Sequence, residues 1–272
     1  MEWKMGGLQN VYADELKIAS NNQIRFVVAD RSISTSPKDN ITIEKNWSTI
    51  TPYSIGHCSA VAYWFAKKMQ TNLQVPIGLV ISNWGATGAE SWISQTGLKK
   101  FPNYIYTKKK EDTSTNQINK NTPSVLFNAM IAPLINLSIK GVIWYQGESN
   151  RGSEDYLKKL QALSAGWSQV FRVKDMPFLL VQIAPYDYVS SDISKGKPPT
   201  SASLLADTVW AAQYKAADTI PGVAVVPIHD TNIDIKNIHP KLKRTVGERL
   251  AAVALKNQYQ KSGVVASAPR FQ

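Results

Sequence analysis

The sequence predicts an α/β fold in which a parallel sheet is covered by helices on both faces. Short runs of almost uninterrupted apolar residues alternate with longer segments in which apolar residues recur every three or four positions. Strands buried on both faces have such continuous apolar runs, and their alternation with helices is typical of parallel sheets. With 272 residues, 43% of them hydrophobic, the chain can bury a large core, and we expect one domain over residues 1–272.

The first expected strand is the apolar run IRFVVA at residues 24–29. Later runs of the same kind predict strands at residues 75–82, 139–145, 177–184 and 223–227. Helical periodicity predicts helices at residues 59–69, 124–137, 155–171, 203–217 and 240–258. Pro133 predicts a kink or break in the second of these helices, because proline removes a backbone donor and clashes with the preceding turn.

Two polar stretches interrupt this alternation. Residues 103–123 are rich in Lys, Thr and Asn and are expected to form a polar insert loop, and residues 187–199 are expected to form a second loop. The net charge is +11, but the only dense basic run, residues 108–110, is followed at once by two acidic residues. We interpret this run as a solvated loop and expect no nucleic-acid partner.

Several function classes are excluded by composition. One cysteine and three histidines give no spacing for a zinc site, so we expect no metal and no other cofactor. No apolar run approaches the roughly 18 residues of a membrane span, so we expect no membrane-spanning segment.

Polar side chains follow the expected strand at residues 139–145, in the run Gln146-Gly147-Glu148-Ser149-Asn150. Ligands bind beyond the carboxyl ends of strands in parallel sheets, and an amide there can donate a hydrogen bond to a developing oxyanion. Glu148 could orient a base or bind a hydroxyl group of the substrate. The alternative is a tight turn that leads into the next helix, and spacing alone slightly favours this alternative.

His239 directly precedes Pro240 and the last expected helix. A histidine on such a loop can act as a general base, and a surface or helix-capping role explains the position equally well. Gly85 follows an expected strand, and its backbone N–H could join an oxyanion hole. For His57 and His229 we expect structural roles.

A hydroxyl nucleophile is harder to identify. The chain contains no Gly-x-Ser-x-Gly elbow. Ser82 and Ser149 lie near expected strand ends, but nothing around them builds a sharp elbow, and we expect structural roles for both.

Several stretches together resemble the sialate O-acetylesterase family of the SGNH (GDSL-like) hydrolases, in order along essentially the whole chain. The most specific are the blocks QGESN and IHPK. The matching stretches are residues 59–65, 76–80, 83–87, 90–93, 127–134, 140–150, 238–241 and 246–251.

This resemblance implies a flavodoxin-like three-layer α/β/α fold with a parallel sheet. It also implies a carbohydrate O-acetylesterase that removes acetyl groups from sugar hydroxyls by serine-type hydrolysis without a metal. His239 matches the base, Gly85 the backbone oxyanion donor, and Gln146 and Asn150 the side-chain donors. The implied partner is an acetylated carbohydrate, and the implied localisation is secreted or periplasmic.

Two departures from the family pattern affect these expectations. The family carries its nucleophile in the stretch Gly-Gln-Ser-Asn-Met-Glu-Trp at the end of its first strand, and this chain opens with Met1-Glu2-Trp3. We therefore expect the serine upstream of Met1 and the central first strand to be missing. The alternative is a non-catalytic or vestigial carbohydrate-binding protein of the same fold.

The second departure concerns the acid partner of the base. The family often has Asp two residues before its histidine, where this chain has Asn237. An amide can orient an imidazole but cannot offset the imidazolium charge. Asp234, Asp230 and Glu148 are the other candidates, and the sequence does not choose among them.

Overall fold

The computed structural model describes residues 1–99, 118–200, 207–232 and 234–266. The five expected strands are confirmed as β1 (Asn21–Ala29), β3 (Ile77–Ile81), β4 (Val142–Trp144), β5 (Phe178–Val181) and β6 (Val223–Val226). The expected helices are confirmed as α2 (Ala60–Leu73), α4 (Val125–Met130), α5 (Tyr156–Val170), α8 (Asp207–Thr219) and α9 (Lys243–Asn257). The first residues of the helix expected at 203–217 and most of the insert expected at 103–123 lie outside the described residues.

The break expected near Pro133 is confirmed. Helix α4 ends at Met130, and a 3-10 turn, η4 (Ala132–Leu134), takes over with the proline in its first turn. Ile131 between them has a non-helical backbone, with φ −122° and ψ −44°. The helix ends before Pro133 because proline has no backbone N–H to donate and its ring clashes with the preceding turn of a helix.

The sequence did not predict several short elements. They are α1 (Gln9–Ile18), β2 (Ile43–Ile50), α3 (Gln95–Lys99), α6 (Tyr188–Ser194), and the 3-10 turns η1 (Met5–Leu8), η2 (Ile55–His57), η3 (Ala89–Trp92), η5 (Glu148–Asn150) and η6 (His229–Thr231). One of them corrects an expectation above, and one adds a strand to the predicted sheet.

The prediction of a loop at residues 187–199 is wrong for the first half of this segment, which forms helix α6. The Ser and Asp residues there favour turns in isolation. The helix forms because the Asp187 carboxylate caps its first turn, accepting a hydrogen bond from Ser190 N at 2.9 Å, and because Tyr188 is buried.

The predicted parallel sheet has one further strand at its edge. Strand β2 pairs with β1 in the antiparallel sense, and the register slips at three places along the pair. These irregularities interrupt the period-two alternation that would have marked β2 in the sequence. All the other strand pairs are parallel.

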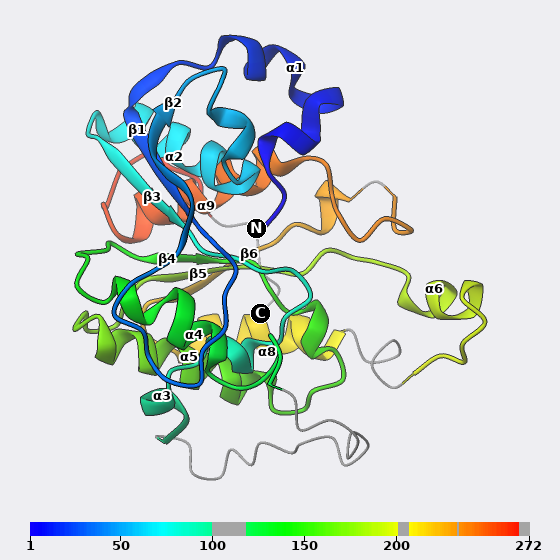
Figure 1. Ribbon diagram of the computed structural model, residues 1–272. Coiled ribbons are helices and arrows are strands. Elements are labelled where there is room, and N and C mark those ends of the chain that lie inside the picture. Colours follow the sequence, from blue (N-terminus) through cyan, green and yellow to red (C-terminus); the bar gives the residue numbers. More distant parts are fainter. Residues whose placement is uncertain (100–117, 201–206, 233, 267–272) are drawn as a thin grey trace.

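Helices cover both faces of the sheet, which confirms the predicted fold class. Figure 1 shows α4, α5 and α8 below β4, β5 and β6, with α2 and α9 above them. Successive residues of β5 divide between the two sides. Phe178 and Leu180 pack in the core with α4, α5 and α8, and Leu179 and Val181 pack in the core with α2 and α9.

The sheet is divided between β3 and β4. Hydrogen bonds join the strands in two groups of three, in the orders β2-β1-β3 and β4-β5-β6. The two strands that border the division lie near each other, because Ile77 of β3 and Ile143 of β4 pack against the same two apolar cores. Within the described ranges no strand pairs with these two facing edges.

The first residue of the chain lies at this division. Met1 packs against the core that also contacts Ile77 and Ile143, and its carbonyl accepts a hydrogen bond from Ser59 Oγ at 2.6 Å. Burial lowers the pKa of the Met1 ammonium from 8.0 to about 5, with a smaller contribution from the Lys243 charge. Figure 1 shows this end of the chain near the centre of the view, between the two groups of strands.

Candidate active site

The turn after β4 is built around a glycine at a position where any side chain would be strained. Gly147 has φ +154°, and a Cβ there would lie 2.7 Å from Ile183 Cγ2 and 2.8 Å from Val209 Cγ1. This backbone ends the strand and starts η5 at once, so Gln146, Glu148 and Asn150 all lie beyond the carboxyl end of β4.

The structure brings Gln146 and Asn150 together with the turn after β3. Gln146 Nε2 donates to Thr87 O at 3.0 Å and to Asn150 Oδ1 at 2.6 Å, and Asn150 Oδ1 also accepts from Ala89 N at 2.9 Å. Asn150 Nδ2 donates to the Glu90 carboxylate at 3.0 and 3.2 Å. The amide hydrogens of both side chains are thus engaged by protein acceptors.

A buried ion pair extends this network and was missed by sequence reasoning. Lys159 is only 6% exposed, and its Nζ lies 2.5 Å from Glu90 Oε1 and 3.1 Å from Asp155 Oδ1. It also donates to Ser153 Oγ at 2.8 Å. The signal in the sequence is a lysine on the face of α5 that otherwise carries Tyr156, Leu160 and Leu163 toward the core.

Gly85 lies in the turn after β3, as expected. Its carbonyl accepts a hydrogen bond from Lys120 Nζ at 2.8 Å. The Glu2 carboxylate, which also pairs with Arg31, lies against its Cα, so that even a methyl group at this position would collide with it. A carboxylate therefore fills the space next to the predicted oxyanion donor.

His239 lies on the loop before α9 and is exposed. Its backbone N–H donates to Asn237 Oδ1 at 2.9 Å, and its ring meets the Trp3 ring edge to face, with 5.8 Å between centroids. Asn237 thus holds the backbone of His239 rather than its imidazole. In the described part of the chain, no carboxylate is hydrogen-bonded to an imidazole nitrogen of His239.

The other three candidates for the acid partner of His239 differ in the groups that they contact. Asp230 forms a two-pronged pair with Arg249, at 2.6 and 2.5 Å, and this hydrogen bonding lowers the pKa of Asp230 to about 2. Asp234 is exposed and caps the backbone of Lys236. Glu148 is the candidate whose negative charge acts on His239, where it raises the pKa of the imidazole.

Lys243, at the start of α9, is a second basic group beside His239 that sequence reasoning did not find. It is 3% exposed, and its Nζ lies 5.5 Å from the centroid of the Trp3 ring and 5.0 Å from that of Tyr145. Burial lowers the pKa of Lys243 to about 8, and the Glu148 charge opposes that shift. A lysine at a helix N-terminus, where acidic residues are favoured, is the available sequence signal.

The pKa of His239 is lowered from 6.5, first by partial burial, then by the Lys243 charge and the nearby N-terminus, while Glu148 opposes the shift. The folded chain therefore binds fewer protons at this site than the unfolded chain. Folding stability from this group is present above the unfolded pKa and is lost as the pH falls through the folded value. The neutral imidazole that a general base requires is kept to lower pH.

Replacing Lys243 with Met is expected to raise the pKa of His239, because it removes a nearby positive charge. Replacing Glu148 with Gln is expected to lower it further. The measurement is an NMR titration of the His239 imidazole resonances in the two variants and in the unchanged chain. If both substitutions leave the His239 titration unchanged, these charges do not act on the imidazole.

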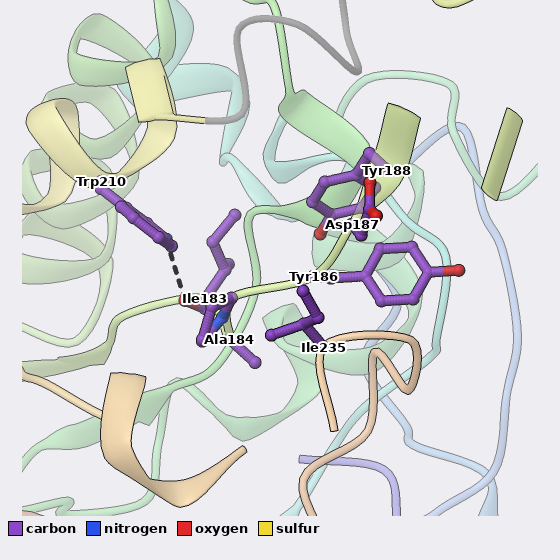
Figure 2. Close-up of a pocket in the computed structure, with 8 residues that line it drawn as sticks. Ile183, Ala184, Tyr186, Asp187, Tyr188, Trp210 and Ile235 are labelled. Atoms are coloured by element: carbon purple, nitrogen blue, oxygen red, sulfur yellow. Dashed lines mark hydrogen bonds between the residues drawn. The ribbon is translucent and has the colours of Figure 1, made fainter. Parts of the chain in front are cut away.

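A cavity of about 300 Å³ lies beyond the carboxyl end of β5, the strand next to β4 (Figure 2). Its lining comes from the segment after β5, from α8 and from the loop that carries His239. These residues are Ile183, Ala184, Pro185, Tyr186, Asp187, Tyr188, Trp210 and Ile235.

The described residues contain no cluster of three His, Cys, Asp or Glu side chains that could hold a metal ion. None of the described helices is both long enough and apolar enough to cross a membrane.

Comparison with known proteins gives a consistent result. Residues 49–256 match the family model described as carbohydrate esterase, sialic acid-specific acetylesterase. Human sialate O-acetylesterase is 32% identical over 278 residues, which cover 91% of this chain and 51% of that protein. The mouse protein of the same name is 30% identical over 291 residues, covering 92% and 53%. The chain spans about half the length of the curated relatives it matches.

Solved structures agree with this result. A carbohydrate acetylesterase from Xanthomonas citri aligns with a TM-score of 0.79 and 31% identity, covering 100% of this chain and 57% of that one. A protein from Arabidopsis thaliana shares the fold alone, with a TM-score of 0.52 and 18% identity over 88% of this chain and 83% of that one.

Proposed function

Because the chain belongs to the sialic acid-specific acetylesterase family of carbohydrate esterases, we propose that it removes acetyl esters from sugar hydroxyls by serine-type hydrolysis. We further propose that the nucleophilic serine lies on a strand that precedes Met1 and fills the division between β3 and β4. The observation that carries this proposal is that Met1 lies at the division, packed against the core that Ile77 of β3 and Ile143 of β4 also contact.

The geometry of the division supports a strand at this place. The facing edges of β3 and β4 belong to parallel pairs, and a parallel strand between them would have its carboxyl end next to Met1. An extended chain advances at most about 3.6 Å per residue, so a serine two residues before Met1 would lie within about 7 Å of it. The contact between the rings of Trp3 and His239, with 5.8 Å between their centroids, supports a position of this serine near the base.

Two serines of this chain, Ser82 and Ser149, are less well placed to be the nucleophile. Ser82 Oγ donates to Met130 O at 3.2 Å, and Ser149 is exposed. Neither hydroxyl is hydrogen-bonded to His239.

The proposed reaction uses these groups in two steps. His239 takes the serine proton as the oxygen attacks the acetyl carbonyl carbon, and the collapsing intermediate expels the sugar oxygen, which takes the proton back from His239. Water, activated by the same imidazole, then cleaves the acetyl-serine ester and releases acetate. Gly85 N–H would stabilise the oxyanion after the Glu2 carboxylate moves away from it. Gln146 or Asn150 would do the same after one of these side chains releases a present hydrogen-bond partner.

The test compares this chain with a version extended by a strand that ends in Gly-Gln-Ser-Asn. We expect the extended chain to hydrolyse 4-nitrophenyl acetate and this chain to show no serine-dependent turnover. The control is the extended chain with that serine changed to Ala, which keeps the strand and removes the hydroxyl.

Two outcomes would count against the proposal. An extended chain that folds but is no more active than its Ser→Ala control would favour a non-catalytic carbohydrate-binding role. Turnover by the unextended chain that is lost on Ser149→Ala or Ser82→Ala would place the nucleophile elsewhere.

A further inference from the structure

The turn after β3 contains a strained residue directly after Gly85. Ala86 has φ +55°, in the left-handed region that is unfavourable for a residue with a side chain. This alanine is exposed, so burial of its methyl group does not offset the strain. A strained backbone of this kind persists only where surrounding contacts fix it, and such residues are frequent in active sites. The neighbours of the turn must therefore hold Ala86 in its conformation.

Two carbonyl groups of this turn accept hydrogen bonds from side chains. Thr87 Oγ1 donates to Trp84 O at 2.7 Å, and Lys120 Nζ donates to Gly85 O at 2.8 Å. The second bond acts directly on Ala86, because Gly85 O and Ala86 N belong to the same planar peptide group. Rotation about the N–Cα bond of Ala86, which φ measures, would move this oxygen away from Lys120.

Lys120 is itself held against the turn by its surroundings. Its Nζ lies 5.7 Å from the centroid of the Trp84 ring, in a cation–π contact. The next residue, Asn121, accepts a hydrogen bond from Gly88 N on its Oδ1 at 3.0 Å. The segment that carries Lys120 therefore contacts the turn both before and after Gly85.

The charge of Lys120 strengthens its bond to the turn. Hydrogen bonds from an ionised donor are stronger than those between neutral groups, and this one is partly buried. Among the residues that the structure describes, no carboxylate forms an ion pair with Lys120. The Gly85 carbonyl is thus an acceptor for a cation that has no anionic partner within those residues.

We propose that Lys120 is a positioning residue of the oxyanion turn, residues 84–88. Its charged hydrogen bond to Gly85 O holds Ala86 in the left-handed conformation and thereby fixes the backbone that carries the Gly85 N–H. Preorganised donors stabilise a developing oxyanion well because they need no rearrangement during the reaction. This inference rests on the proposed function for the role of Gly85 N–H, and Lys120 acts through Gly85 without touching the substrate.

The first experiment uses this chain and needs no nucleophile. The NMR chemical shifts of the Ala86 backbone and Cβ report its φ. We expect Lys120→Met to move these shifts toward the values of a residue with negative φ, because Ala86 relaxes once the bond to Gly85 O is lost. Lys120→Arg keeps a charged N–H donor and should leave them unchanged. The matched control is Lys256→Met, which removes an exposed lysine in the last turn of α9 and should also leave them unchanged.

The second experiment measures hydrolysis of 4-nitrophenyl acetate by the strand-extended chain. Removing an oxyanion donor altogether lowers kcat by about 10² to 10³, and here the donor is displaced but still present. We therefore expect Lys120→Met to lower kcat about 30-fold and to change KM less than about twofold. Lys120→Arg should restore at least about a third of the original kcat, and Lys256→Met should have no effect.

A double-mutant cycle with Ala86→Gly distinguishes positioning of the turn from general destabilisation. Glycine adopts positive φ without strain, so the turn then depends less on Lys120. In the Ala86→Gly background we expect Lys120→Met to lower kcat only about fivefold. A merely structural role of Lys120 predicts the same factor in both backgrounds, because independent effects add.

Unchanged Ala86 shifts in Lys120→Met would overturn the proposal. A loss of activity that appears in KM alone, that Lys120→Arg does not restore, or that is equal in the two backgrounds would overturn it as well. Failure of the proposed function gives a different result. The extended chain would then be no more active than its Ser→Ala control, while the Ala86 shifts would still show whether Lys120 holds the turn.

Discussion

In the strand-extended chain, His239→Ala is expected to lower kcat/KM for 4-nitrophenyl acetate by about 10³-fold. A positioned general base contributes about 10² to 10⁴ in rate, and the serine hydroxyl is a poor nucleophile without one. Partial burial and the Lys243 charge keep this imidazole neutral below its ordinary pKa, so the loss should be visible from neutral pH down to the acid limb.

The matched control for this substitution is His229→Ala. His229 is also exposed, and it lies in η6 next to the Asp230–Arg249 pair. We expect less than a twofold change for this control, and we expect added imidazole to restore part of the activity of His239→Ala only. Equal losses in the two variants would show that His239 is not the base.

Lys159→Met is expected to lower the free energy of unfolding by about 3 to 5 kcal/mol. Methionine replaces the side-chain stem but leaves the Glu90 carboxylate, whose side chain is 16% exposed, without its cation. Removing one partner of a buried ion pair leaves an uncompensated charge, and this is the main source of the cost. Because Glu90 also accepts from Asn150, the site turn after β4 should loosen with it.

The control is Lys4→Met, which removes a cation from the exposed Lys4–Glu44 pair. Both side chains of that pair are more than a third exposed, at 39% and 38%, and solvent screens the interaction. We expect a change of at most about 1 kcal/mol. Urea denaturation at pH 7 measures both variants, and similar losses for the two would show that burial of Lys159 contributes nothing extra.

The helices and strands that build the two cores could be predicted because each carries its own periodicity. The continuous apolar run of β5 and the three-to-four spacing of α5 and α9 each mark burial within a single segment. Helix α6 could not be predicted in this way, since its stability depends on the burial of Tyr188 against the rest of the fold. Strand β2 was missed because bulges shift its apolar positions out of alternation.

The candidate site was predicted in part. Sequence and family resemblance named Gly85, Gln146, Asn150 and His239. In the structure Gly85 follows β3, Gln146 and Asn150 follow β4, and His239 lies on the loop before α9. Their present hydrogen bonds could not be predicted. Gln146 and Asn150 bond to residues about 60 positions away in the sequence, and no local pattern encodes such a partner.

The sequence by itself therefore determined the α/β class, the order of the main elements and the polar clusters after the strands. Only the tertiary structure decided that the sheet is divided between β3 and β4, and that Met1 packs at this division. It also decided that Lys159 and Lys243 are buried beside the candidate site. The physical reason is that periodicity records which face of each segment is buried, whereas strand pairing and buried charges depend on contacts between residues far apart in the chain.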